Sequence, residues 1–409
     1  MAGANRSMLQ LILELREYYG IEPFVLLPEY HGDNKSLKDH LIENNIPFKV
    51  SFIHFFKKID HSACSRWNAI VSYRRIKGLA KELLPYKFDL VHSNSSVIDF
   101  GGFLSRELGI KHVWHLRDFG NLDYSLSCVF GETYERLTYR NAESFIAISN
   151  SVKQHFCKTI DPSRITTIYN GVELKPNVPL SSHQNSTVQF LCAGVYCEAK
   201  NQMEILRAID VLINEHHVSD FHVTIVGIGV EGQYAYQLKQ FSKDHSIEEY
   251  VSILGEIDGI AELASAMDVG IMPSHNEAFG RVTVEYMLQN LAVIANDSGA
   301  NVEIIEHGKS GLIYPHDDFR SLAVNMKRLI QDRSQISTLA SCGRQRANAY
   351  FLSEYNTKAI FELYQEIVQH SPYSQNTLSN CVCRLIIAYY SIRSYLSIRQ
   401  YALRARLLR

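Results

Sequence analysis

Two glutamates with seven residues between them, Glu277 and Glu285, form the pattern in this sequence that is best suited to chemistry. The apolar run Val269–Met272 predicts a buried strand that leads into a polar loop, and a helix is predicted to begin near Arg281, just after Gly280. The free N–H groups and the dipole of such a helix start bind anions, including diphosphates. Carboxylates beside them can accept hydrogen bonds from sugar hydroxyls. The same spacing also fits a helix-start carboxylate followed by a solvated helix residue.

The elements that must position these glutamates are short apolar runs that alternate with helical patterns. This alternation predicts βαβ units, because parallel strands buried on both faces read as short continuous apolar runs. In the first half of the chain we expect strands at 24–28, 48–50, 89–92, 112–115 and 144–149, and helices at 7–19, 37–44, 69–84 and from 151 onward.

A polar, proline-containing stretch between Gly171 and Ser186 predicts a linker, after which the alternation starts again. Strands are expected at 188–193, 221–226, 269–272 and 292–295, with a helix at 202–214. A chain of 409 residues is long enough for two such α/β domains. Ligands of open α/β sheets bind at the carboxyl ends of the strands, where both glutamates are expected.

The composition excludes several classes of protein. A formal net charge of −2 gives no electrostatic case for nucleic acid. The eight dispersed cysteines lack paired zinc spacing, so we expect reduced thiols and no metal site, with the C-x-C pair Cys381 and Cys383 as the lesser alternative for binding a metal. Neither a signal peptide nor an apolar run of membrane-spanning length is visible. We therefore expect a cytoplasmic protein that is soluble or lies on a membrane surface.

Several segments, in one consistent order between about residues 3 and 370, resemble family 4 of the retaining glycosyltransferases, which have the GT-B fold. The run from Glu277 to Glu285 resembles the family's E-x7-E motif, and Gly194–Asn201 resembles its G-x-x-x-x-x-K-G loop, with Lys200 at the lysine. The remaining matches are Gly3–Ser7, His115–Asp118, Ile168–Val172, Gly227–Gly229, Ser298–Glu303 and His307–Leu312.

The resemblance implies a role for each matching residue. Glu277 would hold hydroxyls of the donor sugar, and Glu285 would hold the ribose of the nucleotide. Lys200 would neutralise the departing diphosphate. His115 would line the reaction centre from the first domain. The backbone near Phe279 and Gly280, together with Gly194 and Arg281, would complete the donor site without a metal or a cofactor. Taken alone, Lys200 would be a surface lysine and His115 a satisfied strand-end histidine.

The sequence departs from the family pattern at three places. Val195 stands where the family often has arginine, so a second cation for the phosphates must come from elsewhere, with Arg281 as a candidate. Asn290 and Ala292 replace a glycine and a proline. The family pattern also has a strand at the centre of the first domain's sheet, ahead of Gly3, and we expect this strand to be missing here.

The implied architecture is GT-B, an α/β fold with two Rossmann-like domains that face a central cleft. We expect an acceptor-binding domain at 1–172, a nucleotide-sugar domain at 186–350, a helix at 351–370 that crosses back to the first domain, and a tail at 371–409. That tail has six arginines and no acidic residue. This composition predicts either an amphipathic helix that lies on an anionic membrane surface or a helix that packs on the first domain.

The function implied is a retaining hexosyltransferase of polysaccharide biosynthesis. It would move a hexosyl unit from a nucleotide diphosphate sugar to a cell-surface glycan or a lipid-linked acceptor. Its expected location is the cytoplasm, peripheral on the inner face of the membrane. The alternatives are a non-catalytic GT-B partner subunit that binds glycan or a sister enzyme, and a GT-B enzyme of another kind, such as a sugar epimerase.

Overall fold

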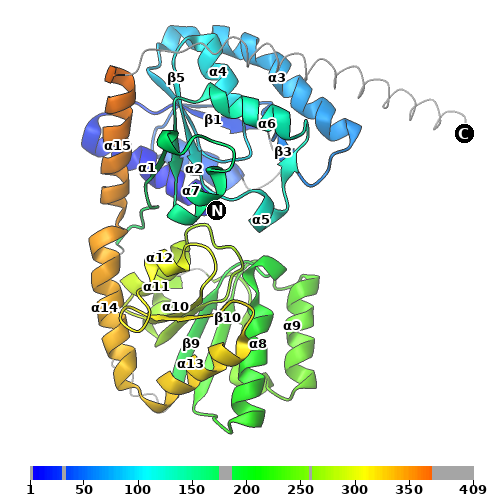
Figure 1. Cartoon of the computed structure of the whole chain (residues 1–409), viewed down its shortest axis with the longest axis vertical. Coiled ribbons are helices and arrows are strands. Elements are labelled where there is room, and N and C mark those ends of the chain that lie inside the picture. Colours follow the sequence, from blue (N-terminus) through cyan, green and yellow to red (C-terminus); the bar gives the residue numbers. More distant parts are fainter. Residues whose placement is uncertain (1–2, 30–33, 175–186, 258–259, 371–409) are drawn as a thin grey trace, which may run out of the picture. The chain divides into compact units, whose positions relative to one another are not determined.

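The computed structural model describes residues 3–29, 34–174, 187–257 and 260–370, and the chain divides into two compact units (Figure 1). Unit 1 extends to Tyr169 and resumes at Asn356, whereas unit 2 comprises Asn170–Tyr355. The arginine-rich tail at 371–409, with its expected membrane helix, lies outside the described residues. Within those residues no helix combines the length and the apolar character needed to cross a membrane.

Unit 1 contains a four-stranded parallel sheet in the order β4-β5-β7-β8 and a separate parallel pair, β1-β2. A short antiparallel pair, β3-β6, was not expected, because two-residue strands carry no periodic signal. The strands are β1 (Val25–Pro28), β2 (Phe48–Ser51), β3 (Lys57–Lys58), β4 (Leu90–Ser93), β5 (Lys111–Leu116), β6 (Ser127–Cys128), β7 (Ser144–Ala147) and β8 (Ile165–Thr167).

The helices of unit 1 include the last described helix of the chain. They are α1 (Gly3–Tyr19), α2 (Asn34–Glu43), α3 (Ala63–Leu83), α4 (Phe100–Leu108), α5 (Asn121–Tyr124), α6 (Glu132–Thr138), α7 (Asn150–Phe156) and α15 (Ser353–His370). Ile360 and Ile367 of α15 share a buried core with Leu11 and Leu15 of α1. The Thr357 hydroxyl donates a hydrogen bond to Glu14 at 2.5 Å. Helix α15 is therefore part of the core of unit 1, although it follows unit 2 in the sequence.

Unit 2 is built on one six-stranded parallel sheet in the order β11-β10-β9-β12-β13-β14. Its strands are β9 (Val188–Ala193), β10 (Phe221–Val226), β11 (Val251–Leu254), β12 (Val269–Met272), β13 (Ala292–Asn296) and β14 (Leu312–Tyr314). Its helices are α8 (Gln202–Asp210), α9 (Gln233–Asp244), α10 (Ile260–Ser265), α11 (Arg281–Leu288), α12 (Asn301–Ile304), α13 (Phe319–Gln331) and α14 (Ser334–Tyr350). Helix α8 packs against α13, and α11 packs against α14.

Most expected elements occur at the expected residues, and the differences have local causes. Helix α3 begins at Ala63, six residues before the expected start, because the Ser62 hydroxyl accepts a hydrogen bond from Ser65 N–H and caps the helix. Regular α-helix in α8 ends at Asp210 and not at Asn214, because a π-helical turn follows it.

Helix α11 is fixed to the sheet by a glycine in β12. A Cβ atom at Gly270 would overlap the ring of Tyr286, which is buried. The Tyr286 hydroxyl in turn accepts the N–H of Ala193, at the end of β9, at 2.7 Å. The start of α11 is thereby held beside the carboxyl ends of the two central strands.

We predict that Gly270→Ala lowers the free energy of unfolding by about 1–3 kcal/mol, because the added methyl group must displace the Tyr286 ring. The matched control is Gly78→Ala in α3, where a Cβ would meet no atom within 4 Å. That change should raise the stability by about 0.5–1 kcal/mol, since alanine is the better helix former. Urea denaturation checks both values, and equal effects of the two changes would contradict the packing argument.

Candidate functional site

Glu277 lies in the loop between β12 and α11, at the carboxyl edge of the unit 2 sheet. The loop after β13 packs directly on its main chain. Ala300 N–H donates to the Glu277 carbonyl oxygen at 2.8 Å. A Cβ at Gly299, whose φ is +65°, would overlap that same carbonyl group. Only glycine fits this contact, so Gly299 sets the position of Glu277 without touching its side chain.

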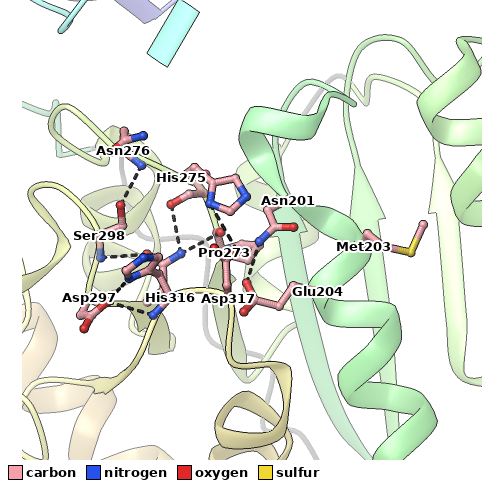
Figure 2. A network of polar contacts seen from close by, with 12 residues as sticks. Asn201, Met203, Glu204, Pro273, His275, Asn276, Asp297, Ser298, His316 and Asp317 are labelled. Carbon is pink, nitrogen blue, oxygen red and sulfur yellow. Dashed lines mark hydrogen bonds and ion pairs between the residues drawn. The ribbon is translucent and has the colours of Figure 1, made fainter. Parts of the chain in front are cut away.

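Polar side chains at the end of β13 complete the support of this loop. The buried Asn296 amide donates to the carbonyl oxygens of Pro273 and Ser274 at 2.8 and 3.1 Å. The Ser298 hydroxyl accepts the N–H of Asn276 at 2.8 Å, as Figure 2 shows. Asn296 was not among the site residues expected from the sequence. The sequence feature that could have identified it is an asparagine at the last position of an otherwise apolar predicted strand.

Lys200 and Glu277 form an ion pair, with 2.7 Å between Nζ and Oε2. Their side chains are 35% and 16% exposed, so the pair is partly shielded from water. Burial alone would raise the pKa of Glu277. The charge and hydrogen bond of Lys200, with a 3.3 Å hydrogen bond from Gly280 N–H, outweigh burial and lower that pKa below its usual value. Two residues 77 positions apart in the sequence thus form one charged site.

The loop that carries Lys200 is anchored at its far end. Asn201 has a φ of +50°, which asparagine tolerates better than most residues. Its amide donates to Glu204 Oε2 at 2.9 Å, and the Tyr314 hydroxyl donates to the same oxygen at 3.1 Å. Figure 2 shows Asn201 above Glu204 at the start of α8. Glu204 is only 3% exposed, and burial raises its pKa to about 7.

The Lys200 loop and the Glu277 loop are also joined through their main chains. His275 N–H, two residues before Glu277, donates to the carbonyl oxygen of Ala199 at 2.9 Å. On the other side, the aliphatic part of Lys200 passes over Gly194, and a Cβ at that glycine would lie 3.8 Å from Lys200 Cγ. Gly194 therefore lies beside the aliphatic part of the lysine, where an added methyl group would make only an ordinary van der Waals contact.

The second predicted acid is paired as well. Arg281 Nε donates to Glu285 Oε1 at 2.9 Å, one turn further along α11. The two side chains are 20% and 32% exposed, and Arg281 Nη1 also donates to the Gly171 carbonyl oxygen at 3.4 Å. The exposed side chain of Val195 provides no cation. Arg281 thus lies in unit 2, as the phosphate candidate would require, but its guanidinium is paired with a carboxylate.

Phe279 and Gly280 differ in what they can offer a ligand. The Phe279 ring is 2% exposed and packs edge-on against Phe351, with 5.9 Å between ring centroids. Only its main chain remains for binding. Gly280 has a φ of +77° directly before α11, and its N–H points at Glu277.

His115 lies in unit 1, at the end of β5, and its side chain is fully buried. Its Nδ1 lies 3.3 Å from Nε2 of His92, whose Nδ1 lies 2.5 Å from the Tyr364 hydroxyl. Burial lowers the pKa of His115 well below 6.5 and that of His92 to about 3, so both rings are neutral at physiological pH. Nearby, Arg117 Nε donates to Asn94 at 2.6 Å. The structure brings Lys200 and Glu277 together in unit 2, and in unit 1 it holds His115 in a buried cluster with His92 and Tyr364.

Among the described residues no three His, Cys, Asp or Glu side chains gather as a metal site would require. The site in unit 2 instead combines two carboxylates, each paired with a cation, around the start of a helix. Such a site can exchange its internal ion pairs for contacts with a ligand that is anionic at one end and rich in hydroxyl groups at the other.

Comparison with known proteins identifies the class. A family described as Glycosyltransferase Family 4 matches residues 1–175, and one described as Glycosyl transferases group 1 matches residues 187–332. Together the two matches cover most of the chain, one in each half. The protein is an enzyme, a glycosyltransferase. It belongs to the group 1 glycosyltransferases of the family 4 type.

Individual relatives are distant. The chain is 23% identical over 323 residues to an Escherichia coli enzyme named UDP-Gal:alpha-D-GlcNAc-diphosphoundecaprenol alpha-1,3-galactosyltransferase, covering 75% of this chain and 82% of that one. It is 22% identical over 246 residues to N-acetyl-alpha-D-glucosaminyl L-malate synthase of Bacillus anthracis, covering 57% and 62%.

Solved structures confirm the expected GT-B fold. Anabaena Alr3699/HepE in complex with UDP and glucose matches with a TM-score of 0.70 and 21% identity, over 89% of this chain and 96% of that one. The apo lipopolysaccharide outer core galactosyltransferase WaaB matches with a TM-score of 0.68 and 14% identity, over 90% and 96%.

The buried Glu204 should make stability depend on pH. In the folded state the pKa of Glu204 is about 7, above its ordinary value of 4.5, so the folded state retains a proton that the unfolded state loses between these values. Stability therefore falls as pH rises from about 4.5 to 7 and then levels off. Relative to Glu204→Gln, the wild type should lose on the order of 2 kcal/mol between pH 5 and pH 8. Urea denaturation at several pH values measures this, and parallel pH profiles for the two proteins would contradict it.

Proposed function

We propose that this glycosyltransferase moves a hexosyl unit from a nucleotide diphosphate sugar to a glycan or lipid-linked acceptor, with retention of anomeric configuration. The observation that carries the proposal is the Lys200–Glu277 ion pair beside the start of α11. The bound diphosphate would take Lys200 as its partner, and Glu277 would then be released to accept hydrogen bonds from the sugar hydroxyls.

The charges of this site suit the departure of a diphosphate. Negative charge grows on the leaving oxygen as the glycosidic bond to the nucleotide breaks, and a preplaced ammonium group and helix N–H groups stabilise it. Glu285 lies one helical turn beyond Arg281 and would bind the ribose hydroxyls. Arg281 would move from Glu285 toward the phosphates, which supplies the second cation that Val195 does not.

The acceptor and the stereochemistry are supported by resemblance. The E. coli relative acts, by its name, on a sugar carried by diphosphoundecaprenol, and WaaB is a galactosyltransferase of the lipopolysaccharide outer core. Retention is supported by the E-x7-E pattern from Glu277 to Glu285. A polysaccharide biosynthesis role, with acceptors at the inner face of the membrane, is consistent with both.

Substitution of Lys200 should weaken nucleotide binding, whereas substitution of Glu277 should reduce turnover without weakening nucleotide binding. We expect Lys200→Ala to weaken binding of UDP at least about tenfold, because it removes the charged partner of the diphosphate. Glu277→Gln should leave UDP binding equal or tighter, since Lys200 is freed, yet reduce turnover of UDP-glucose or UDP-galactose about 100-fold or more. Calorimetry measures UDP binding, UDP release measures turnover, and proton NMR reports the anomer of the product.

The matched control is Arg320→Ala, which removes the cation of an exposed ion pair with Glu215 in the same unit. Glu215 lies in the π-helical turn beyond the carboxyl end of α8, whereas Lys200 lies ahead of the amino end of that helix, so neither binding nor turnover should change. Should GDP or ADP bind in place of UDP, the same variants are compared with the corresponding sugars. Nucleotide binding with no turnover of any donor would overturn the proposal in favour of a non-catalytic partner subunit, and sugar interconversion without acceptor would favour an epimerase.

We also propose that the arginine-rich tail at 371–409 binds an anionic membrane, where a lipid-linked acceptor would be found. Its six arginines lack any acidic neighbour within the tail, and each cation near such a surface contributes roughly 1 kcal/mol. The full chain should co-sediment with vesicles containing phosphatidylglycerol, less so at high salt, and not with phosphatidylcholine alone. A chain ending at His370 should lose this binding; if it sediments as well as the full chain, the tail is not the anchor.

A further inference from the structure

Three side chains in unit 1 form a hydrogen-bonded chain that joins helix α15 to the end of strand β5. The Tyr364 hydroxyl lies 2.5 Å from Nδ1 of His92, and Nε2 of His92 lies 3.3 Å from Nδ1 of His115. His92 is in β4 and His115 is in β5, and these strands are neighbours in the sheet. The proposed function gives no role to Tyr364 or to His92.

Both imidazole rings in this chain are neutral. Burial removes the water that would stabilise a charged ring, and the guanidinium of Arg117 opposes a second positive charge nearby. The pKa of His92 is therefore lowered to about 3, and that of His115 falls well below its usual value. A neutral imidazole has one nitrogen that donates a hydrogen bond and one that accepts. The neighbours of each ring decide which nitrogen carries the proton.

The Tyr364 hydroxyl sets the direction of the hydrogen bonds. Within the described residues its hydrogen-bond partner is Nδ1 of His92. Burial raises the pKa of the phenol, so the hydroxyl keeps its proton. If Nδ1 of His92 were the donor, this buried proton would have no acceptor, which is unfavourable. The hydroxyl therefore donates, and Nδ1 of His92 accepts.

The position of the proton on His115 follows from this direction. Because Nδ1 of His92 accepts from the tyrosine, His92 has its own proton on Nε2 and donates it to Nδ1 of His115. His115 must then carry its proton on Nε2. That nitrogen is buried and has no hydrogen-bond partner in the part of the chain that the structure describes. A buried donor without an acceptor is rare in folded proteins and needs an explanation.

The place of His115 in the sheet suggests what the donor is for. His115 is the last residue but one of β5, at the carboxyl edge of the sheet, where ligands of α/β units bind. The resemblance to family 4 also puts His115 at the reaction centre.

We propose that Tyr364 and His92 are positioning residues that hold His115 as a hydrogen-bond donor at Nε2, so that the ring offers an N–H group, and not a lone pair, to a hydroxyl oxygen of the transferred sugar. The contact with the sugar rests on the proposed function. The direction of the hydrogen bonds does not depend on it.

The test uses the full chain with isotope-labelled nitrogen in its histidine rings, because the NMR shifts of the two ring nitrogens report which one carries the proton. The variants His92→Gln and His115→Gln assign the resonances. In the wild type we expect both rings to be neutral with the proton on Nε2. In Tyr364→Phe the direction is no longer fixed, so the shifts of both rings should move toward the average of the two tautomers. The kcat for the sugar donor should fall about three- to tenfold, with UDP binding unchanged within about twofold.

The matched control is Tyr134→Phe, which removes another buried hydroxyl of unit 1, the donor of a 2.7 Å hydrogen bond to Asp99. This variant should change neither the ring-nitrogen shifts nor kcat. A proton on Nδ1 of His115 in the wild type, or equal shifts in the wild type and Tyr364→Phe, would overturn the proposal. Equal losses of kcat in the two variants would also overturn it, because a general loss of stability would then explain both.

Sugar donors separate this inference from the proposed function. Whichever of UDP-glucose and UDP-galactose is turned over should move the Nε2 resonance of His115, and UDP alone should not. If a donor is turned over without moving this resonance, the contact with the sugar is wrong and the proposed function stands. If the wild type turns over no donor, the proposed function and the sugar contact both fail, and the ring-nitrogen shifts still decide the direction of the hydrogen bonds.

Discussion

The ion pair between Lys200 and Glu277 is the interaction on which the proposed donor site depends. Removing either partner would leave a partly buried charge alone, which is costly, whereas the intact pair is stable with the added hydrogen bond from Gly280 N–H. The surrounding structure serves to keep these two side chains together. Gly299 fixes the loop of Glu277, and the Asn201–Glu204 contact fixes the loop of Lys200. If the proposal is right, a diphosphate that takes Lys200 frees Glu277 for the sugar, so recognition of the sugar and of the diphosphate would be coupled.

The fold could be predicted from the sequence wherever the apolar and polar pattern of a single segment is enough to identify a strand or a helix. The four central strands of unit 2, β10, β9, β12 and β13, are mostly apolar runs, and β9, β10 and β12 have the expected bounds. Helix α3 begins six residues before the start that its amphipathic pattern predicts, because the helix starts at the Ser62 cap and the pattern begins only later. The pair β3-β6 could not be predicted, since two-residue strands exist only through the contact between distant segments.

The candidate site also has parts that could be predicted from the sequence and parts that could not. Lys200 and Glu277 follow β9 and β12, which are neighbours in the sheet, so their proximity follows from strand order once the fold is known. The roles of Tyr286 and Asn296 do not, because each depends on one contact across the sheet edge. The burial of His115 also could not be read from its strand, since Tyr364 of α15, from much later in the sequence, packs against its neighbour His92.

Helix α15 has a practical consequence for dividing this protein into pieces. Its isoleucines are built into the core of unit 1, yet the gene encodes them after the whole of unit 2. A fragment that stops at Tyr169 would expose the apolar face of α1 and is expected to aggregate. Unit 2 is continuous from Asn170 to Tyr355 and can be excised whole, whereas unit 1 can be produced alone only by splicing a short linker between Tyr169 and Asn356.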